Sequence, residues 1–290
     1  MFGTGTDTDQ ATGLRRRQVQ PPPRVIAISG GKGGVGKTLV AVNLAVALAR
    51  AGNDTMLMDA DLGLANVDVA LGLQSQGDLS DVLSGARSLS DVVVEGPSGL
   101  KVVPAASGVT AMVGLDAAAH AGLVNAFGSY DAPLDYLLVD TAAGISEDVL
   151  AYACAAQEVL VVLTDEPASL TDAYALIKVL SRERGIERFR VVANMVRNGD
   201  HGRALFRKLS AVSERFLDTT LHYVGAVPLD GGVRRAIQDQ RSVLDAAPES
   251  PAATAFRRLA DAVEQWPAPT GPSGDLEFFV ERVLAAARTH

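Results

Sequence analysis

Cysteine is nearly missing from this chain of 290 residues, which contains only Cys154. A single cysteine cannot form a disulfide within the chain or supply a cysteine-rich metal site, and it argues against an iron–sulfur carrier. Because Cys154 lies in an apolar run of small residues, we expect it to be a buried core residue.

Long hydrophobic runs and basic charge are also scarce. No stretch of about 18 apolar residues occurs, so the sequence predicts no transmembrane helix. No apolar segment follows the arginines at 15–17 before the prolines at 21–23, which argues against a twin-arginine export signal. The net charge of −8 argues against broad nonspecific DNA binding, although a local basic patch stays possible. We therefore expect a cytoplasmic protein.

The length and the 48% share of hydrophobic residues suit one large α/β domain. Short apolar runs alternate with helical patterns, which predicts a doubly wound, mainly parallel sheet in three α/β/α layers. A helical stripe includes Val40, Leu44 and Ala51, with Gly52 as its stop, and further helices are expected at 79–83, 109–128 and after Pro167. The expected strands are Arg24–Ile28, Thr55–Met58, Leu100–Val103, Tyr136–Asp140, Val159–Leu163, Phe189–Ala193 and Tyr223–Val227.

A phosphate-loop pattern, G-x-x-x-x-G-K-[ST], spans Gly31 to Thr38 between the first strand and the first helix. Its glycines let backbone N–H groups point inward around phosphate oxygens, and the following helix N-terminus adds partial positive charge. We expect Lys37 to neutralise the terminal phosphates and the Thr38 hydroxyl to hold Mg²⁺. The remaining loop residues of the predicted phosphate site are Gly33, Gly34, Val35 and Gly36.

Carboxylates follow the apolar runs that we expect to flank this loop. Asp59 and Asp61 end the second strand, and Asp140 ends the fourth expected strand in a Walker B pattern. Carboxyl ends of parallel strands meet at one edge of a sheet, so these groups should surround the metal and the γ-phosphate. The Gly144 N–H is placed to sense that phosphate, which makes residues 141–146 a switch segment.

A second lysine inside the loop, Lys32, makes the sequence Lys-Gly-Gly-Val-Gly-Lys-Thr, which resembles the deviant Walker A motif of the MinD/ParA family. The resemblance implies an ATP-bound sandwich dimer in which Lys32 reaches the phosphates of the partner subunit. It also implies that Asp61 directs the attacking water and that Asp59 supports Mg²⁺ and a first switch at 62–72. Asn194 and the loop after Pro228 would hold the adenine.

Other segments resemble the flagellar-number regulator branch of that family, FlhG or FleN. Asp9–Arg15 is similar to its N-terminal DQAxxLR element, and Asp140–Ser146 reads Asp-Thr-Ala-Ala-Gly-Ile-Ser. The resemblance implies a slow regulatory ATPase that activates an FlhF-type GTPase through Gln10, Leu14 and Arg15. It also implies binding to a FleQ-type transcription activator.

The sequence divides into four parts: a flexible segment at 1–23, the ATPase domain at 24–265, a linker at 266–274 and a tail at 275–290. The tail has apolar residues at helical spacing, Leu276, Phe279, Val280, Val283 and Leu284. Family resemblance makes it a membrane-targeting helix at the inner face of the cell membrane, whereas its mixed charge also fits docking on the protein. We expect docking in the monomer and release in the ATP-bound dimer.

Alternatives stay open at this point. A partition ATPase that binds DNA would need a basic stripe, for which the arginines at 182, 184, 188 and 190 are candidates. A MinD-like division-site ATPase is a second alternative. A metabolic P-loop synthetase or kinase is a third, and it should form a stoichiometric small-molecule product and need no membrane tail. We expect no direct sequence-specific binding to nucleic acid.

Overall fold

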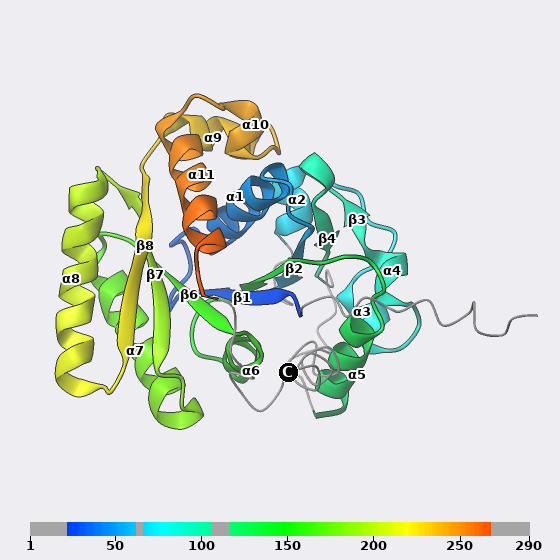
Figure 1. Ribbon diagram of the computed structural model, residues 1–290, viewed down its shortest axis with the longest axis horizontal. Coiled ribbons are helices and arrows are strands. Elements are labelled where there is room, and N and C mark those ends of the chain that lie inside the picture. Colours follow the sequence, from blue (N-terminus) through cyan, green and yellow to red (C-terminus); the bar gives the residue numbers. More distant parts are fainter. Residues whose placement is uncertain (1–21, 62–65, 106–116, 268–290) are drawn as a thin grey trace, which may run out of the picture.

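The computed structural model describes residues 22–61, 66–105 and 117–267. One eight-stranded sheet in the order β3-β4-β2-β5-β1-β6-β7-β8 forms its centre, and helices cover both faces (Figure 1). Neighbouring strands run parallel except for the antiparallel pair β3–β4, which confirms the predicted architecture. The strands are β1 Arg24–Ser29, β2 Thr55–Ala60, β3 Val94–Glu95, β4 Lys101–Val103, β5 Tyr136–Thr141, β6 Glu158–Leu163, β7 Arg188–Val196 and β8 Thr220–Pro228.

The helices mostly follow the expected alternation with strands. Those in the described residues are α1 Lys37–Arg50, α2 Val67–Leu71, α3 Leu79–Leu83, α4 Leu89–Val92, α5 Ala117–Gly128, α6 Glu147–Ala155, α7 Pro167–Arg184, α8 Gly199–Phe216, α9 Gly231–Gln238, α10 Val243–Ala246 and α11 Pro251–Glu264, with a short 3₁₀ turn at Pro97–Gly99. None of them is long and apolar enough to cross a membrane.

The central strands β1, β2 and β5 are buried along their whole length, as expected for parallel strands covered on both faces. Their register aligns Asp140 with Ile28 on one side and with Asp59 on the other. The sheet therefore brings both carboxylates beside the end of the strand that leads into the phosphate loop.

Helix α1 is buried nearly all round, because it packs on the sheet and is covered by α11, α2 and α10 (Figure 1). Its buried residues run without interruption from Val40 to Ala49, so a single apolar stripe was too narrow a prediction. The placement of Ala51 in that stripe was wrong, since the helix ends at Arg50 and Ala51 is an exposed cap.

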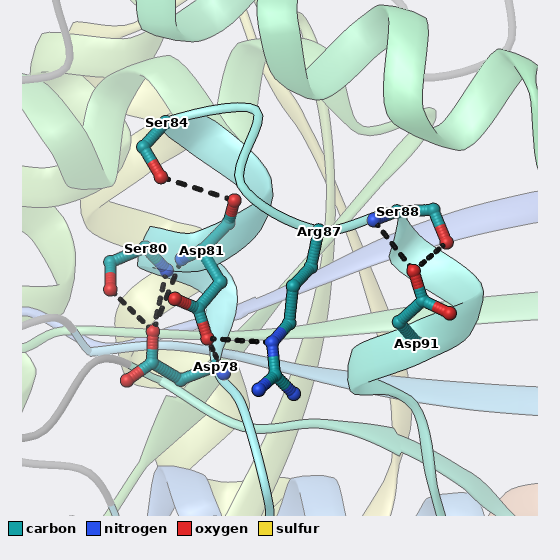
Figure 2. Close-up of polar contacts among 7 residues, drawn as sticks. All are labelled: Asp78, Ser80, Asp81, Ser84, Arg87, Ser88 and Asp91. Atoms are coloured by element: carbon teal, nitrogen blue, oxygen red, sulfur yellow. Dashed lines mark hydrogen bonds and ion pairs between the residues drawn. The ribbon is translucent and has the colours of Figure 1, made fainter.

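Two short helices at the β3–β4 end of the sheet start with reciprocal caps (Figure 2). Asp78 accepts from the Ser80 N–H at 2.8 Å, and the Asp78 N–H donates to Asp81 at 3.2 Å. In α4 the Ser88 N–H and hydroxyl both donate to Asp91, at 3.0 and 2.6 Å. Such capping boxes satisfy N–H groups that a helix start leaves unpaired, which lets helices of one turn persist here.

Some boundaries differ from the expectation. Strands β7 and β8 extend beyond the predicted runs, and the part of the predicted 109–128 helix before residue 117 lies outside the described residues. Cys154 is half-buried against the core rather than fully enclosed. The last described helix ends at Glu264, just before the predicted linker, of which only 266 and 267 lie within the described residues; Arg24 donates to the carbonyls of Trp266 at 2.9 Å and Pro267 at 2.6 Å.

Candidate nucleotide-binding site

The phosphate loop needs glycine at two positions for different reasons. Gly36 caps helix α1 with a φ of 85°, in the left-handed region that glycine adopts without penalty. Gly31 packs against helix α7 so closely that a Cβ there would lie 2.1 Å from the carbonyl oxygen of Asp172. The loop is therefore shaped from below by α7 as well as by its own turns.

Buried charges face one another just beneath the loop. Lys37 is buried and its pKa is lowered by desolvation, an effect that the nearby Asp140 and Asp61 partly offset. Burial raises the pKa of Asp140 to about 8, against the opposing influence of the Thr38 hydroxyl and Lys37. Neither Asp140 oxygen has a hydrogen-bond partner of good geometry among the described residues. A buried carboxylate left in this state fits a divalent cation, which would supply the missing charge.

Both oxygens of the Asp59 carboxylate accept hydrogen bonds from backbone N–H groups that follow β2. Its Oδ1 accepts from the Asp61 N–H at 3.0 Å, and its Oδ2 accepts from the N–H groups of Asn66 and Val67 at 2.9 and 3.1 Å. Burial nevertheless raises the pKa of Asp59 to about 6. The carboxylate thus holds the start of α2, whereas its predicted contribution to Mg²⁺ binding stays a prediction.

The second switch segment is closed onto the phosphate loop. Gly144 has a φ of 97°, and its N–H donates to the Gly30 carbonyl at 3.1 Å. Because this N–H already has an acceptor, contact with a γ-phosphate would require the bond to open. Gly144 can act as the predicted phosphate sensor only if its N–H exchanges the Gly30 carbonyl for a γ-phosphate oxygen.

A mostly apolar cavity of about 340 Å³ lies beside the loop. Asn194 connects this cavity to the phosphate loop, because it lines the cavity and its Nδ2 donates to the Val35 carbonyl at 2.9 Å. Its buried Oδ1 has no partner among the described residues. The free acceptor suits the amino group of adenine, and the apolar walls suit the faces of the base. The lining includes the predicted Pro228 with Leu229 and Asp230 of the loop after it, and also residues that the sequence did not single out: Leu39, Met195, Val227, Val233, Arg234, Ile237 and Gln238.

Lys32 is held within its own chain. Its Nζ forms an ion pair with Glu166, the residue just before α7, and both side chains are partly exposed. Glu166 could not be selected from the local sequence, since the pair joins residues 134 positions apart. To reach a partner subunit, as the family resemblance implies, Lys32 would have to leave Glu166.

Several predicted site residues lie outside the described residues. These are Gln10, Leu14 and Arg15 of the N-terminal element, Leu276, Phe279, Val280, Val283 and Leu284 of the tail, and residues 62–65 of the first switch. The remaining predicted residues converge on the carboxyl-end edge of the sheet. A phosphate loop, buried lysine, orphaned carboxylate and adjoining base cavity together define a P-loop nucleotide-binding protein.

Comparison with known proteins narrows this class. The ParA family, described as "NUBPL iron-transfer P-loop NTPase", matches residues 22–264. Antiactivator FleN of Pseudomonas aeruginosa is 56% identical over 91% of this chain and 94% of that protein. Flagellum site-determining protein YlxH of Helicobacter pylori is 34% identical over 78% of this chain and 76% of its own. The chain belongs to the ParA/MinD family of P-loop NTPases.

Solved structures agree with this assignment. The cell division ATPase MinD of Pyrococcus furiosus superposes with a TM-score of 0.69 at 28% identity, over 84% of this chain and 99% of the other. MinD of Pyrococcus horikoshii, solved with Mg-ADP, superposes at 0.68 and 26% identity, over 84% and 97%. ATP and Mg²⁺ are the ligands of the family, as the sequence predicted.

Proposed function

We propose that this protein is an ATP-dependent molecular switch that regulates flagellar number or placement. The observation that carries the proposal is the coincidence of a complete deviant phosphate loop with 56% identity to Antiactivator FleN over nearly the whole chain. The relative with a flagellar site-determining role, at 34% identity, supports the same reading.

The chain's own residues would act on ATP as follows. Phosphates would lie against the loop amides and Lys37, with Mg²⁺ held by the Thr38 hydroxyl and the Asp140 carboxylate. The cation supplies charge neutralisation on the phosphoryl oxygens. Asp61, whose backbone N–H donates to the Asp59 carboxylate, would orient the attacking water. Lys32 would leave Glu166 and contact the phosphates bound to a second subunit. Because part of the site then comes from that subunit, hydrolysis should be slow in the monomer.

The output of the switch is proposed from family likeness. The ATP-bound dimer would bind a FleQ-type transcription activator and stimulate an FlhF-type GTPase through residues 9–15. The segment 275–290 would bring the otherwise cytoplasmic dimer to the inner face of the cell membrane. Two tails on one dimer would bind a membrane more tightly than one, through avidity.

A decisive experiment compares nucleotide-dependent size and membrane binding on the same samples. Light scattering and liposome pelleting would be run with Mg-ADP and Mg-ATP for the wild type, Asp61→Ala and a chain ending at residue 267. We expect a dimer only with ATP, prolonged in Asp61→Ala, and pelleting only when the tail is present. A protein that stays monomeric with ATP in both full-length forms would contradict the switch.

The other functions gain less support. Among the candidate basic residues, Arg184 pairs with Glu147, Arg190 with Glu158, and Arg182 donates to the Phe216 carbonyl. Two of the four candidate arginines are thus paired with carboxylates, which weakens the case for a basic stripe that binds DNA. The likeness to a cobyrinic acid a,c-diamide synthase is 21% identical and concerns the fold alone. No group of three or more potential metal-binding His, Cys, Asp or Glu residues occurs within the described ranges.

A further inference from the structure

Helix α9 borders the base cavity along one wall. Val233, Ile237 and Gln238 all line the cavity, and Ile237 is 55% exposed, which is unusual for so large an apolar side chain. A base that enters the cavity would cover this surface and restrain α9. Binding of a base in the cavity would therefore affect the position of α9.

The turn after α9 reaches a different part of the site. Gln240 lies just beyond the helix, and its backbone N–H donates to the Ile237 carbonyl at 3.2 Å. Its side-chain Nε2 donates to the Val69 carbonyl of α2 at 3.0 Å. Gly72, which ends α2, packs against the same residue, because a Cβ there would lie 3.3 Å from the Gln240 Cβ.

The opposite end of α2 is tied to the catalytic edge. Asp59 accepts from the N–H groups of Asn66 and Val67 at the start of the helix and from the N–H of Asp61. Helix α2, only five residues long, is thus held at one end by the carboxylate that positions Asp61 and at the other by Gln240. A shift of Gln240 would reach Asp61 through one short rigid element.

The backbone of Gln240 indicates that its side chain matters. Its φ is 50°, in the left-handed region that glycine or asparagine adopts at lower cost than glutamine. A tight turn alone would be served better by those residues. A glutamine is long enough to place an amide donor on α2 from this turn.

We propose that Gln240 is a positioning residue that couples base occupancy of the cavity to helix α2 and, through Asp59, to Asp61. The inference rests on the proposed ATPase function, which it deepens. It means that the base contributes to hydrolysis as well as to binding. Adenine, which fits beside Asn194, would set α9 and Gln240 correctly, whereas a base that fits less well would bind but leave α2 misplaced.

The test uses the full chain and the variants Gln240→Gly and Gln240→Asn. Both substitutions relieve the left-handed backbone, and neither can place a donor on the Val69 carbonyl. Ser98→Gly is the matched control, because Ser98 is exposed, has a φ of 60° and lies outside the site. Steady-state kinetics with Mg-ATP and Mg-GTP would be combined with hydrogen exchange of residues 66–72 in the presence of nonhydrolysable analogues.

We expect both Gln240 variants to lower kcat for ATP by about two- to tenfold, the range for one lost hydrogen bond, with KM for ATP unchanged. We expect the wild type to have a higher kcat for ATP than for GTP. In the Gln240 variants this ratio of kcat values should fall toward one, and nucleotide-induced protection of residues 66–72 should be lost. Ser98→Gly should match the wild type. Equal losses in kcat for both nucleotides, or unchanged protection in the Gln240 variants, would overturn the coupling.

Failure of the proposed function would look different. A wild-type chain that hydrolyses neither nucleotide would contradict the ATPase assignment, while the exchange of residues 66–72 with bound analogue would still decide the role of Gln240. Protection that depends on adenine in the wild type and vanishes in Gln240→Gly would support the coupling in that case as well.

Discussion

Two buried charges at opposite edges of the central sheet, Asp140 and Arg24, differ in how well the fold supplies them with partners. At the carboxyl-end edge, Asp140 has a pKa raised to about 8 by burial and no well-formed hydrogen bond among the described residues. At the amino-end edge, Arg24 is also buried, yet its Nη atoms donate to the carbonyls of Val263, Trp266 and Pro267. Only its Nε lacks a partner in the part of the chain that the structure describes.

A second pair strengthens the contrast. Arg190 and Glu158, near the amino-end edge, form two parallel hydrogen bonds at 2.9 and 3.1 Å, and the Arg190 guanidinium lies 4.5 Å from the centre of the Trp266 ring. Such forked, stacked pairs are among the stronger charge contacts in proteins. The fold supplies partners for Arg24 and Arg190 at this edge, whereas the Asp140 carboxylate at the other edge has no hydrogen-bond partner of good geometry among the described residues. The contrast predicts which substitutions affect stability and which affect activity.

The largest effect is expected for Asp140→Asn. Removing the buried carboxylate should lower Mg²⁺-dependent ATP hydrolysis by about 10²–10³-fold, because a preorganised charge at the metal is lost. The thermal stability of the nucleotide-free protein should rise at pH 8, since a desolvated charge is also removed. Calorimetry and a phosphate-release assay would measure both. A less stable Asp140→Asn protein would contradict the contrast between the edges.

The pH dependence of stability should carry the same signature. In the folded protein the pKa values of Asp140 and Asp59 are raised to about 8 and about 6, so the folded state binds more protons than the unfolded state between about pH 4 and pH 8. Stability without metal and nucleotide should therefore fall as the pH rises through this window, by about 1 kcal/mol per pH unit for each proton. Urea unfolding at several pH values would measure the slope, which Asp140→Asn should flatten.

Within the phosphate loop, Gly31→Ala should be more harmful than Gly33→Ala. The new methyl group at 31 would meet the Asp172 backbone at 2.1 Å, whereas a Cβ at 33 has no atom within 4 Å. Overpacking of this kind costs about 1–3 kcal/mol. Thermal unfolding without nucleotide isolates the packing effect from phosphate binding. Equal stabilities for the two variants would show that α7 does not shape the loop.

At the amino-end edge, Arg24→Met should lower stability and spare catalysis. The methionine keeps an apolar stem but leaves three carbonyls without donors, which should cost about 1–3 kcal/mol. Arg258→Met, at an exposed arginine, is the control for the loss of a positive charge. ATP hydrolysis per folded molecule should match that of the wild type. A loss of kcat in Arg24→Met that Arg258→Met does not show would contradict a purely structural role for Arg24.

The smallest effect is expected for Glu166→Gln, which releases Lys32. The pair is partly exposed, so it should contribute less than about 1 kcal/mol. We expect unchanged stability and a slightly lower ATP concentration for half-maximal dimerisation, measured by light scattering. Weaker dimerisation would mean that Glu166 acts in the dimer rather than restraining Lys32 in the monomer.

Local patterns predicted the central parts of the fold well. The strand before the phosphate loop and the Walker B strand follow from continuous apolar runs, and the carboxylates that end them fall at one edge because the strands are parallel.

Contacts between segments far apart in the chain could not be predicted from the sequence. Nothing local links Lys32 to Glu166, Asn194 to Val35, or Gln240 to Val69, because each pair depends on how separate elements pack. The contacts of Arg24 with the Trp266 and Pro267 carbonyls are a further example. Proline and glycine content indicates where a chain leaves regular structure, but not where a buried arginine holds it in place.

The Arg24 contacts have a topological consequence. They join the first strand to the residues just after the last described helix. The beginning and the end of the described domain are therefore neighbours in space. A short glycine-rich tether could connect residue 267 to residue 22, with new ends opened in the exposed turn at 84–88. Such a circular permutant should retain nucleotide binding, because the severed turn lies between α3 and α4, away from the phosphate loop. The first strand and the residues after α11 are therefore held together at the amino-end edge of the sheet, opposite the edge that carries the phosphate loop.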